Sequence, residues 1–493
     1  MSLLYSIGDQ HLPILSIGGF LMLFFLVAIF SATIYTLRVV SHRFGRNSQH
    51  HKEGESKTHL VQENNLLPDY DFGSPSTNIV GDIRQSPRLW MGLSGNLWRL
   101  AGVTGVAQFC MSLWAWQFGI FLAGVVEKWQ IGLTFSIGTF AMIVGYGVSG
   151  TVADFIGRKN AMIFSFVPMC AGLLALRFFP VWPLIPLEYG VTSFGWAFVV
   201  IMSRAMPADE IAQTDGQNSA RIFNMTLLPA FLVDGISPIV AALLLDAGYV
   251  AGDLHLLAAL GALVAIVATS RIVKESLGKD LMQKAKAGPM ITFRGLGRNF
   301  WVFTSGMFGF VFIGNLAFPY LGNLVVGEWG LSESTYGFAW AAYSFTSVIL
   351  MYNVSSLTDK NVRVALVLAI WSTAVIVGMF AFGSGVLALI VLNIIWAAPL
   401  VVWTGAENSL AVNGVADEMK GRALGTYQLL MSSTRLFGSF VGAILWDYFG
   451  SLRTVFSIAS IGGLIIVVGL TYAIMSIKIE RKPRKTVVLG KTE

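Results

Sequence analysis

Charged side chains are scarce in this sequence. Asp, Glu, Lys and Arg together make up 12% of its 493 residues, about half of the roughly 25% that soluble domains carry. Apolar residues make up 55% and recur in long runs along the chain. Runs of about 18 residues or more can cross a hydrocarbon core of about 30 Å, where the backbone must pair with itself as a helix. The sequence therefore predicts an all-α polytopic membrane protein and excludes a soluble enzyme.

Cysteine is nearly absent, since the sequence holds only Cys110 and Cys170, both within apolar runs. Two such thiols make no disulfide framework, and their positions suit small buried side chains. The sequence also lacks a Walker loop, a dinucleotide fingerprint, a zinc motif and a nucleophilic serine elbow. We therefore expect no cofactor, no bound metal, no catalytic residue and no ATP-driven transport by this chain alone.

Basic residues are distributed unevenly between thirteen predicted membrane spans, the first of which runs from Leu12 to Val39. Of the 33 Lys and Arg residues, 29 fall in segments expected on one side of the membrane, and three fall on the other side (Lys128, Arg177 and Arg453). Basic loops stay in the cytoplasm. We therefore expect a multi-pass protein of the cell membrane with its N-terminus outside and its C-terminus in the cytoplasm. The net charge of +6 reflects this topology and predicts no nucleic-acid partner.

Polar stretches divide the chain into six predicted parts. Two of them are six-helix bundles, and the others connect or flank these bundles. In chain order the parts are an N-terminal accessory transmembrane helix (1–40), a polar cytoplasmic linker (41–95), the first bundle (96–274), a cytoplasmic central loop (275–298), the second bundle (299–477) and a basic cytoplasmic tail (478–493).

The loop at residues 150–159 reads GTVADFIGRK. It resembles the loop signature of the major facilitator superfamily, with Gly150, Asp154, Gly157, Arg158 and Lys159 as the matching residues. Phe155 stands where that signature usually has a basic residue. The equivalent loop of the second half holds a weaker echo without the glycines, formed by Asp359, Lys360 and Arg363.

This resemblance covers roughly residues 90–480 and implies a major-facilitator-like fold. Two six-helix bundles would surround a central cavity that opens alternately to the two sides of the membrane. The two acidic and basic loops would then act as a gating motif, which holds helix ends together in one conformation and releases them in another. The first predicted span lies outside the resemblance and would be an accessory helix.

Two ionisable residues occupy matching places in the two halves. Asp234 lies 12 residues before Asp246, and Arg435 lies 12 residues before Asp447. A charge inside a span costs about 2.5–3.5 kcal/mol on insertion scales, so each one requires an explanation. Arg435 is a candidate for binding a substrate anion, and Asp234 for binding a proton or a cation. The alternative is that a neighbouring helix neutralises each of them.

Further candidates for a substrate or proton pathway are acidic, amide and aromatic residues within predicted spans. The resemblance implies that the first span of each three-helix unit lines the cavity, and lipid cannot satisfy the amides found there. Glu407 and Asn408 lie near the expected cytoplasmic end of one such span. The remaining candidates are Trp116, Gln117, Asn315, Tyr320, Asn323 and Asn393.

These patterns favour a secondary transporter of a small organic solute, either driven by an ion gradient such as protons or acting as a uniporter. Its expected partners are the lipid bilayer, the solute and protons. The alternative is a non-transporting subunit or sensor that docks a protein partner through its first helix. Charges retained within spans and the intact 150–159 loop favour transport.

Overall fold

The computed structural model describes residues 93–213, 219–276, 293–411, 415 and 420–477. These residues form helices and connecting segments, and none of them forms a strand. The chain separates into one compact unit at 75–358 and 362–493 and another at 1–74 and 359–361. The first predicted span, the basic tail and both termini lie outside the described residues. The description below concerns the larger unit.

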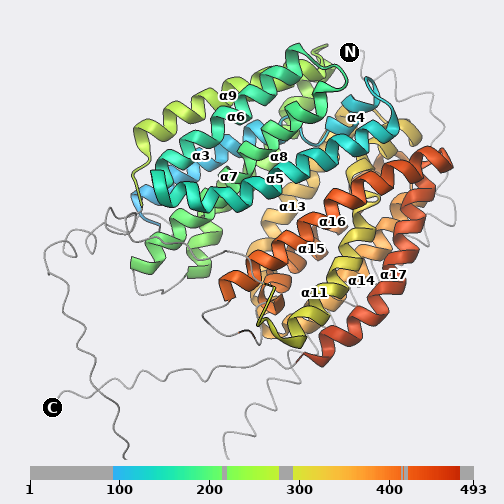
Figure 1. Ribbon diagram of the computed structural model, residues 1–493. Coiled ribbons are helices and arrows are strands. Elements are labelled where there is room, and N and C mark those ends of the chain that lie inside the picture. The colour runs from blue at the N-terminus through green and yellow to red at the C-terminus, as the bar shows by residue number, and fades with distance from the viewer. Residues whose placement is uncertain (1–92, 214–218, 277–292, 412–414, 416–419, 478–493) are drawn as a thin grey trace, which may run out of the picture. The chain divides into compact units, whose positions relative to one another are not determined.

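The first half of this unit consists of antiparallel helices that pack on one another (Figure 1). Gly157 and Gly248 lie in turns between consecutive helices, with φ values of 93° and 92°. The helices are α3 (Gly95–Ser112), α4 (Phe118–Ala123), α5 (Lys128–Ile156), α6 (Arg158–Phe178), α7 (Leu184–Gln213), α8 (Ser219–Asp246) and α9 (Ala251–Ile272).

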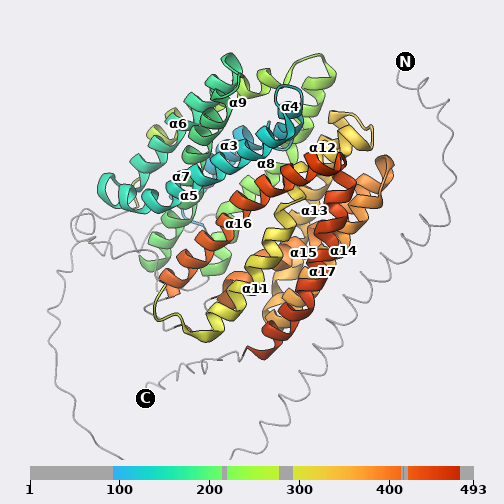
Figure 2. The same ribbon diagram turned by 45° about the vertical axis from the view of Figure 1, so that its right-hand side comes forward.

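The second half repeats this order of helices (Figure 2). Its first span is interrupted after α11, as the first span of the preceding half is interrupted after α3. The elements are α11 (Gly297–Asn315), the 3₁₀ turn η2 (Phe318–Tyr320), α12 (Leu321–Asn323), the π-helical turn η3 (Leu324–Glu328), α13 (Glu333–Lys360), α14 (Val362–Phe382), α15 (Gly385–Ala411), α16 (Lys420–Phe449) and α17 (Leu452–Ser476).

Length and composition suit these helices to a bilayer. Within the described ranges, ten helical segments are long and apolar enough to cross a membrane. Helices α3 and α13 fall outside that group but occupy the first and second places in their sets of six. Large apolar side chains such as Leu263, Val264 and Ile465 are exposed, as expected of a surface that faces lipid chains. The all-α membrane fold is therefore confirmed.

The two bundles meet closely at one end, which we call the Gly248 end; the opposite end, with the 150–159 loop, is the Gly157 end. Helix α5 packs against α16, where Ser136 Oγ donates a hydrogen bond of 2.6 Å to the carbonyl of Leu436. Near the interruptions of the first spans, Asn323 Nδ2 donates a hydrogen bond of 2.7 Å to the carbonyl of Gly119. Small residues allow this approach, because a Cβ at Gly132 would overlap the Cβ of Ala443.

Candidate functional site

A cavity of about 960 Å³ lies among helices of both bundles, in the half of the unit nearer the Gly157 end. Helices α5 and α7 line it from the first bundle, and α11 and α13 to α17 line it from the second. On α16 the lining residues recur at helical spacing, because residues three, four and seven apart share a face. These residues are Gly425, Gln428, Leu429, Met431, Ser432 and Arg435.

Two arginines bring positive charge to the cavity. Arg435 extends from α16, and Arg204 contributes from α7. Both side chains are exposed, and neither forms an ion pair within the part of the chain that the structure describes. The charges of both act on the hydroxyl of Tyr146, which also lines the cavity. Two guanidinium groups that have no ion-pair partner among the described residues therefore face one space.

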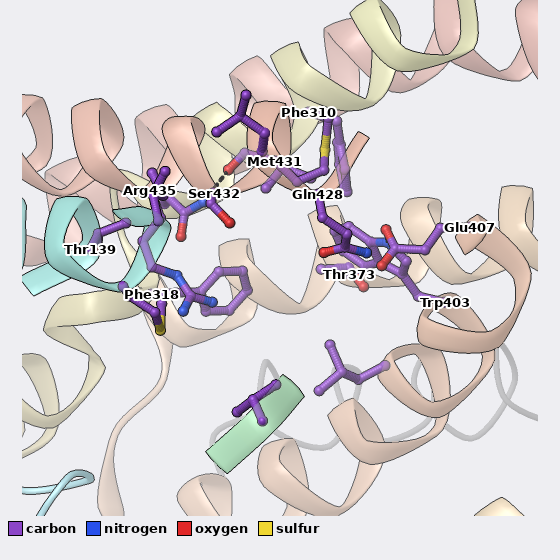
Figure 3. A pocket seen from close by; sticks show the side chains of 18 of the residues that line it. Thr139, Phe310, Phe318, Thr373, Trp403, Glu407, Gln428, Met431, Ser432 and Arg435 are labelled. Atoms are coloured by element: carbon purple, nitrogen blue, oxygen red, sulfur yellow. Dashed lines mark hydrogen bonds between the residues drawn. The ribbon is translucent and has the colours of Figure 1, made fainter. Parts of the chain in front are cut away.

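The acidic residue of the lining is Glu407, on α15. Its carboxylate accepts a hydrogen bond of 2.5 Å from Trp403 Nε1 and one of 3.1 Å from the Tyr427 hydroxyl. Figure 3 shows Glu407 and Trp403 on the side of the cavity opposite Arg435. The carboxylate is therefore already satisfied by neutral donors on its own side and is not paired with the arginines.

Aromatic rings form much of the remaining wall. Phe318 and Trp396 stack with centroids 4.7 Å apart and nearly parallel planes, and Tyr343 lies 5.4 Å from the same indole ring. Trp340 continues this row at 5.6 Å from Tyr343. Stacked and tilted rings at these distances form a rigid apolar surface. The cavity thus combines a row of aromatic rings with two arginines in its lining.

Asp234 does not line the cavity, although its symmetry-related partner Arg435 does. Its carboxylate accepts hydrogen bonds from Gln108 Nε2 (3.0 Å) and from the Ser112 hydroxyl, both on α3. The Ser344 hydroxyl, on α13 of the other bundle, donates a third at 2.9 Å. Asp234 therefore links the two bundles near the middle of their helices, and its charge is satisfied by neutral donors.

The other predicted pathway residues are divided between the cavity and its surroundings. Asn315 lines the cavity and donates to Thr434 Oγ1 at 3.2 Å. Asn393 is buried and bonds the carbonyl of Leu389 on its own helix at 2.9 Å. The side chain of Asn408 lies outside the described residues.

Four predicted pathway residues lie toward the Gly248 end instead of lining the cavity. Trp116 packs 5.7 Å from the ring of Tyr336, and Gln117 is fully buried where α3 gives way to α4. The Tyr320 hydroxyl donates to the carbonyl of Ser439, and Asn323 bonds Gly119. In this conformation these residues belong to the contact that closes that end.

Sequence reasoning did not single out Arg204, Trp340 or Tyr343 as lining residues. Arg204 was counted with the cytoplasmic loops, but α7 continues to Gln213 and carries it into the cavity. Its position on the same helix face as Val200 was a usable signal, since residues four apart share a face. Trp340 and Tyr343 lie on a second helix of a three-helix unit, which the resemblance did not single out.

The 150–159 loop ties three helix ends together at the Gly157 end. Arg158 Nη1 pairs with Asp154 at 2.7 Å, and Arg158 Nε pairs with Asp209 of α7 at 3.3 Å. The Glu275 carboxylate accepts from the backbone N–H groups of Arg158 (2.9 Å) and Lys159 (3.1 Å). Acidic groups are stabilised at a helix N-terminus such as that of α6. Asp154 thus orients Arg158 toward α7 while Glu275 caps α6.

The echo of this loop in the second half is tied differently. Arg363 Nη1 donates to the carbonyls of Met475 (3.1 Å) and Ile477 (2.8 Å), at the end of α17. A cation at a helix C-terminus satisfies carbonyls that have no partner within the helix. The side chains of Asp359 and Lys360 lie outside the described residues, and their gating role stays a prediction.

Replacing Asp154 with Asn should lower the transport turnover several-fold while leaving the protein folded in the membrane. The substitution preserves size but removes the charge that holds Arg158 toward Asp209, so the helix ends lose a fixed arrangement. Solute flux in proteoliposomes measures the turnover, and thermal unfolding checks the fold. Asp447→Asn, an exposed acid at the Gly248 end, is the matched control. Wild-type flux in Asp154→Asn would refute a gating role.

Comparisons with known proteins find exporters among the relatives by sequence and transporters among the solved structures. No protein-family model matches the chain. The enterobactin exporter EntS of Shigella flexneri is 22% identical over 372 residues, spanning 72% of this chain and 85% of the exporter. The exporter of the same name from Escherichia coli O1:K1 is 23% identical over 371 residues, with the same shares covered.

Solved structures agree at the level of the fold. The nucleoside transporter NupG superposes with a TM-score of 0.60 at 13% identity, covering 78% of this chain and 99% of that structure. The human organic anion transporter MFSD10 superposes with a TM-score of 0.55 at 14% identity, covering 76% and 99%. An auto-inhibited peptide transporter of the POT family reaches 0.62 at 11% identity, covering 79% and 98%. These likenesses show that the chain shares the fold of those transporters, in agreement with the resemblance of the 150–159 loop to the major facilitator signature.

Proposed function

We propose that this protein moves a small organic solute across the cell membrane by alternating access. The observation that carries the proposal is the asymmetry between the two ends of the bundles. Contacts such as Ser136 to Leu436 and Asn323 to Gly119 join the bundles at the Gly248 end, whereas a cavity lies between them toward the Gly157 end. A transporter needs a second state in which these contacts separate and the cavity faces the other way.

The Gly157 end is the cytoplasmic end in this proposal. Among the described residues, the helix ends there carry Arg158, Lys159, Arg271, Lys274, Arg294 and Arg298, and basic loops remain in the cytoplasm. The structure then corresponds to the state in which the cavity faces the cytoplasm. The N-terminus would lie outside because one further span, at 12–39, precedes the bundles.

Two features favour transport over a role as a docking subunit. Arg204 and Arg435 face a cavity of about 960 Å³ without forming an ion pair among the described residues. Charges in such places are costly and are retained where a substrate or ion passes. The network of Asp154, Arg158 and Asp209 is the second feature, because it fixes the ends of α5, α6 and α7 to one another, as a bundle that moves as one body requires.

Asp234 is the candidate for proton coupling. Its carboxylate is held by donors from α3 and by Ser344 of the opposite bundle, so adding a proton replaces one acceptor with a donor at a contact between the bundles. The titratable group facing it from α13 is Tyr343, on which the charge of Asp234 acts. Protonation of Asp234 would therefore weaken a hydrogen-bonded contact between the bundles that must break during the transport cycle.

Flux in proteoliposomes tests both parts of this proposal. A mixed panel of labelled organic solutes should show saturable, protein-dependent flux of at least one member. If Asp234 carries the coupling proton, Asp234→Asn should abolish uptake driven by a pH gradient but spare the exchange of solute across the membrane. Ser457→Ala, far from this contact on α17, is the control. Unchanged pH-driven uptake in Asp234→Asn would remove the proton role, and flux of no solute in either direction would favour the docking subunit.

A further inference from the structure

We propose that the cavity binds an aromatic organic anion, a planar ring system bearing a carboxylate, sulfonate or similar group. This inference rests on the proposed transport function and specifies its substrate class. It combines two properties of the cavity lining that the family resemblance does not prescribe. The lining carries two arginines and a row of aromatic rings.

The sign of the charge follows from the titratable residues of the lining. Arg204 and Arg435 are exposed to the cavity and form no ion pair with residues in the described ranges. Glu407, the acidic member of the lining, already accepts hydrogen bonds from Trp403 and Tyr427. An anion gains from two free guanidinium groups, whereas an organic cation would meet them without a free carboxylate as compensation.

The ring system follows from the aromatic side chains of the lining. The rings of Phe318, Trp396, Tyr343 and Trp340 form a continuous row with centroids 4.7 to 5.6 Å apart. Aromatic surfaces bind other aromatic rings through offset and edge contacts that add to the burial of area. Such rings also bind cations, but the two arginines in the same lining repel a cationic ligand.

The volume of the cavity and the depth of its two arginines support the same class of substrate. A cavity of about 960 Å³ is at the upper end of the roughly 300–1,000 Å³ that hold drug-sized ligands. Arg435 lies 12 residues from Asp447 near the end of α16, about midway along the helix, while Arg204 lies nearer the Gly157 end of α7. Arg204 would attract the anion at the cytoplasmic side, and Arg435 would bind it at depth.

Three small probes that differ in one property each test the proposal. They are 2-naphthalenesulfonate, decahydronaphthalene-2-sulfonate, which keeps the charge and the two-ring carbon skeleton but is not aromatic, and 2-naphthylmethylammonium, which keeps the rings and reverses the charge. Binding is measured by titration calorimetry with the full chain in nanodiscs of phosphatidylcholine, with empty nanodiscs as the blank. The naphthalenesulfonate should bind roughly tenfold or more tightly than either of the other two.

Arginine variants locate the site. Arg435→Gln should weaken naphthalenesulfonate binding by roughly tenfold or more, and Arg435→Lys should also weaken it because the planar fork is lost. Arg204→Gln should weaken it several-fold. Arg271→Gln, an exposed arginine on α9 outside the cavity lining, is the matched control and should bind as the wild type does.

Each outcome tests either the aromatic-anion assignment or the proposed transport function. Equal binding of the three probes, or full naphthalenesulfonate affinity in both Arg435 variants, overturns the aromatic-anion assignment, and this holds even if another solute of the panel is transported. Binding that depends on Arg435 without any flux supports the assigned site and counts against transport. If Arg435→Gln fails to fold, the comparison of probes on the wild type and the Arg435→Lys variant still decides.

Discussion

A disulfide between cysteines placed at positions 242 and 337 should reduce solute flux to background, and reduction should restore it. Ala242 lies on α8 of the first bundle and Gly337 on α13 of the second. A Cβ at position 337 would lie 3.2 Å from the Cβ of Ala242. Disulfides need a Cβ separation of about 3.5–4.5 Å, so a shift of a few tenths of an ångström suffices. The cross-link holds α8 against α13, and alternating access requires these helices to separate.

The natural cysteines make this experiment practicable. Cys110 and Cys170 are both buried and free, and the variants are made in a background in which both are replaced by Ala. Cysteines at 141 and 190 form the matched control, because a Cβ at Gly190 would lie 3.6 Å from that of Ala141, within a single bundle. That cross-link should leave flux intact. Undiminished flux through a fully oxidised 242–337 pair would contradict alternating access in this chain.

Replacing Gly132 with Val should shift the protein toward the opposite state, in which the Gly248 end is open. A Cβ at Gly132 would overlap the Cβ of Ala443 and would lie 3.1 Å from the carbonyl oxygen of Ser439. Overpacking of this kind costs about 1–3 kcal/mol, and separation of α5 from α16 relieves it. A free-energy change of that size alters the population ratio of the two states by roughly 5- to 150-fold. The state with the closed Gly248 end should therefore no longer predominate.

Spin-label distances measure this shift at both ends. Labels at Tyr249 and Tyr448, which are exposed at the Gly248 end, should move apart in Gly132→Val. Labels at Asn160 and Arg298, which are exposed at the Gly157 end, should approach each other. In Gly469→Val, where an added Cβ meets nothing within 4 Å, both distances should match the wild type. A loss of folded protein without any change in either distance would show that Gly132 serves packing alone.

Sequence composition and one loop were sufficient to predict the class of this protein. The apolar runs predicted membrane helices, and the residues from Gly150 to Lys159 carried the resemblance to the major facilitator superfamily, because both signals depend on local chemistry. The equal spacing of Asp234 and Arg435 from Asp246 and Asp447 placed them correctly on equivalent helices, α8 and α16. These predictions needed no knowledge of which face each helix turns toward its neighbours.

The surroundings of Asp234 and Arg435 depend on how each helix is oriented about its own axis. The sequence does not specify this orientation for helices that are apolar on every side. Arg435 faces the cavity, whereas Asp234 turns toward Gln108 and Ser112 of α3 and Ser344 of α13. Gln117 and Asn323, two amides of the first spans, fail to line the cavity for another reason. The interruptions after α3 and α11 move Gln117 and Asn323 away from the cavity. Pro319 signals the second interruption, whereas the first has no proline or glycine pair in the sequence.

The volume of the cavity also makes solvent a participant in the cycle. At about 30 Å³ of liquid per water molecule, a space of about 960 Å³ holds on the order of thirty waters when no solute is bound. Each turn of the cycle must release this water on one side of the membrane and admit it on the other. The equilibrium between the two states is therefore an osmotic balance, and solutes excluded from the cavity favour whichever state encloses less water.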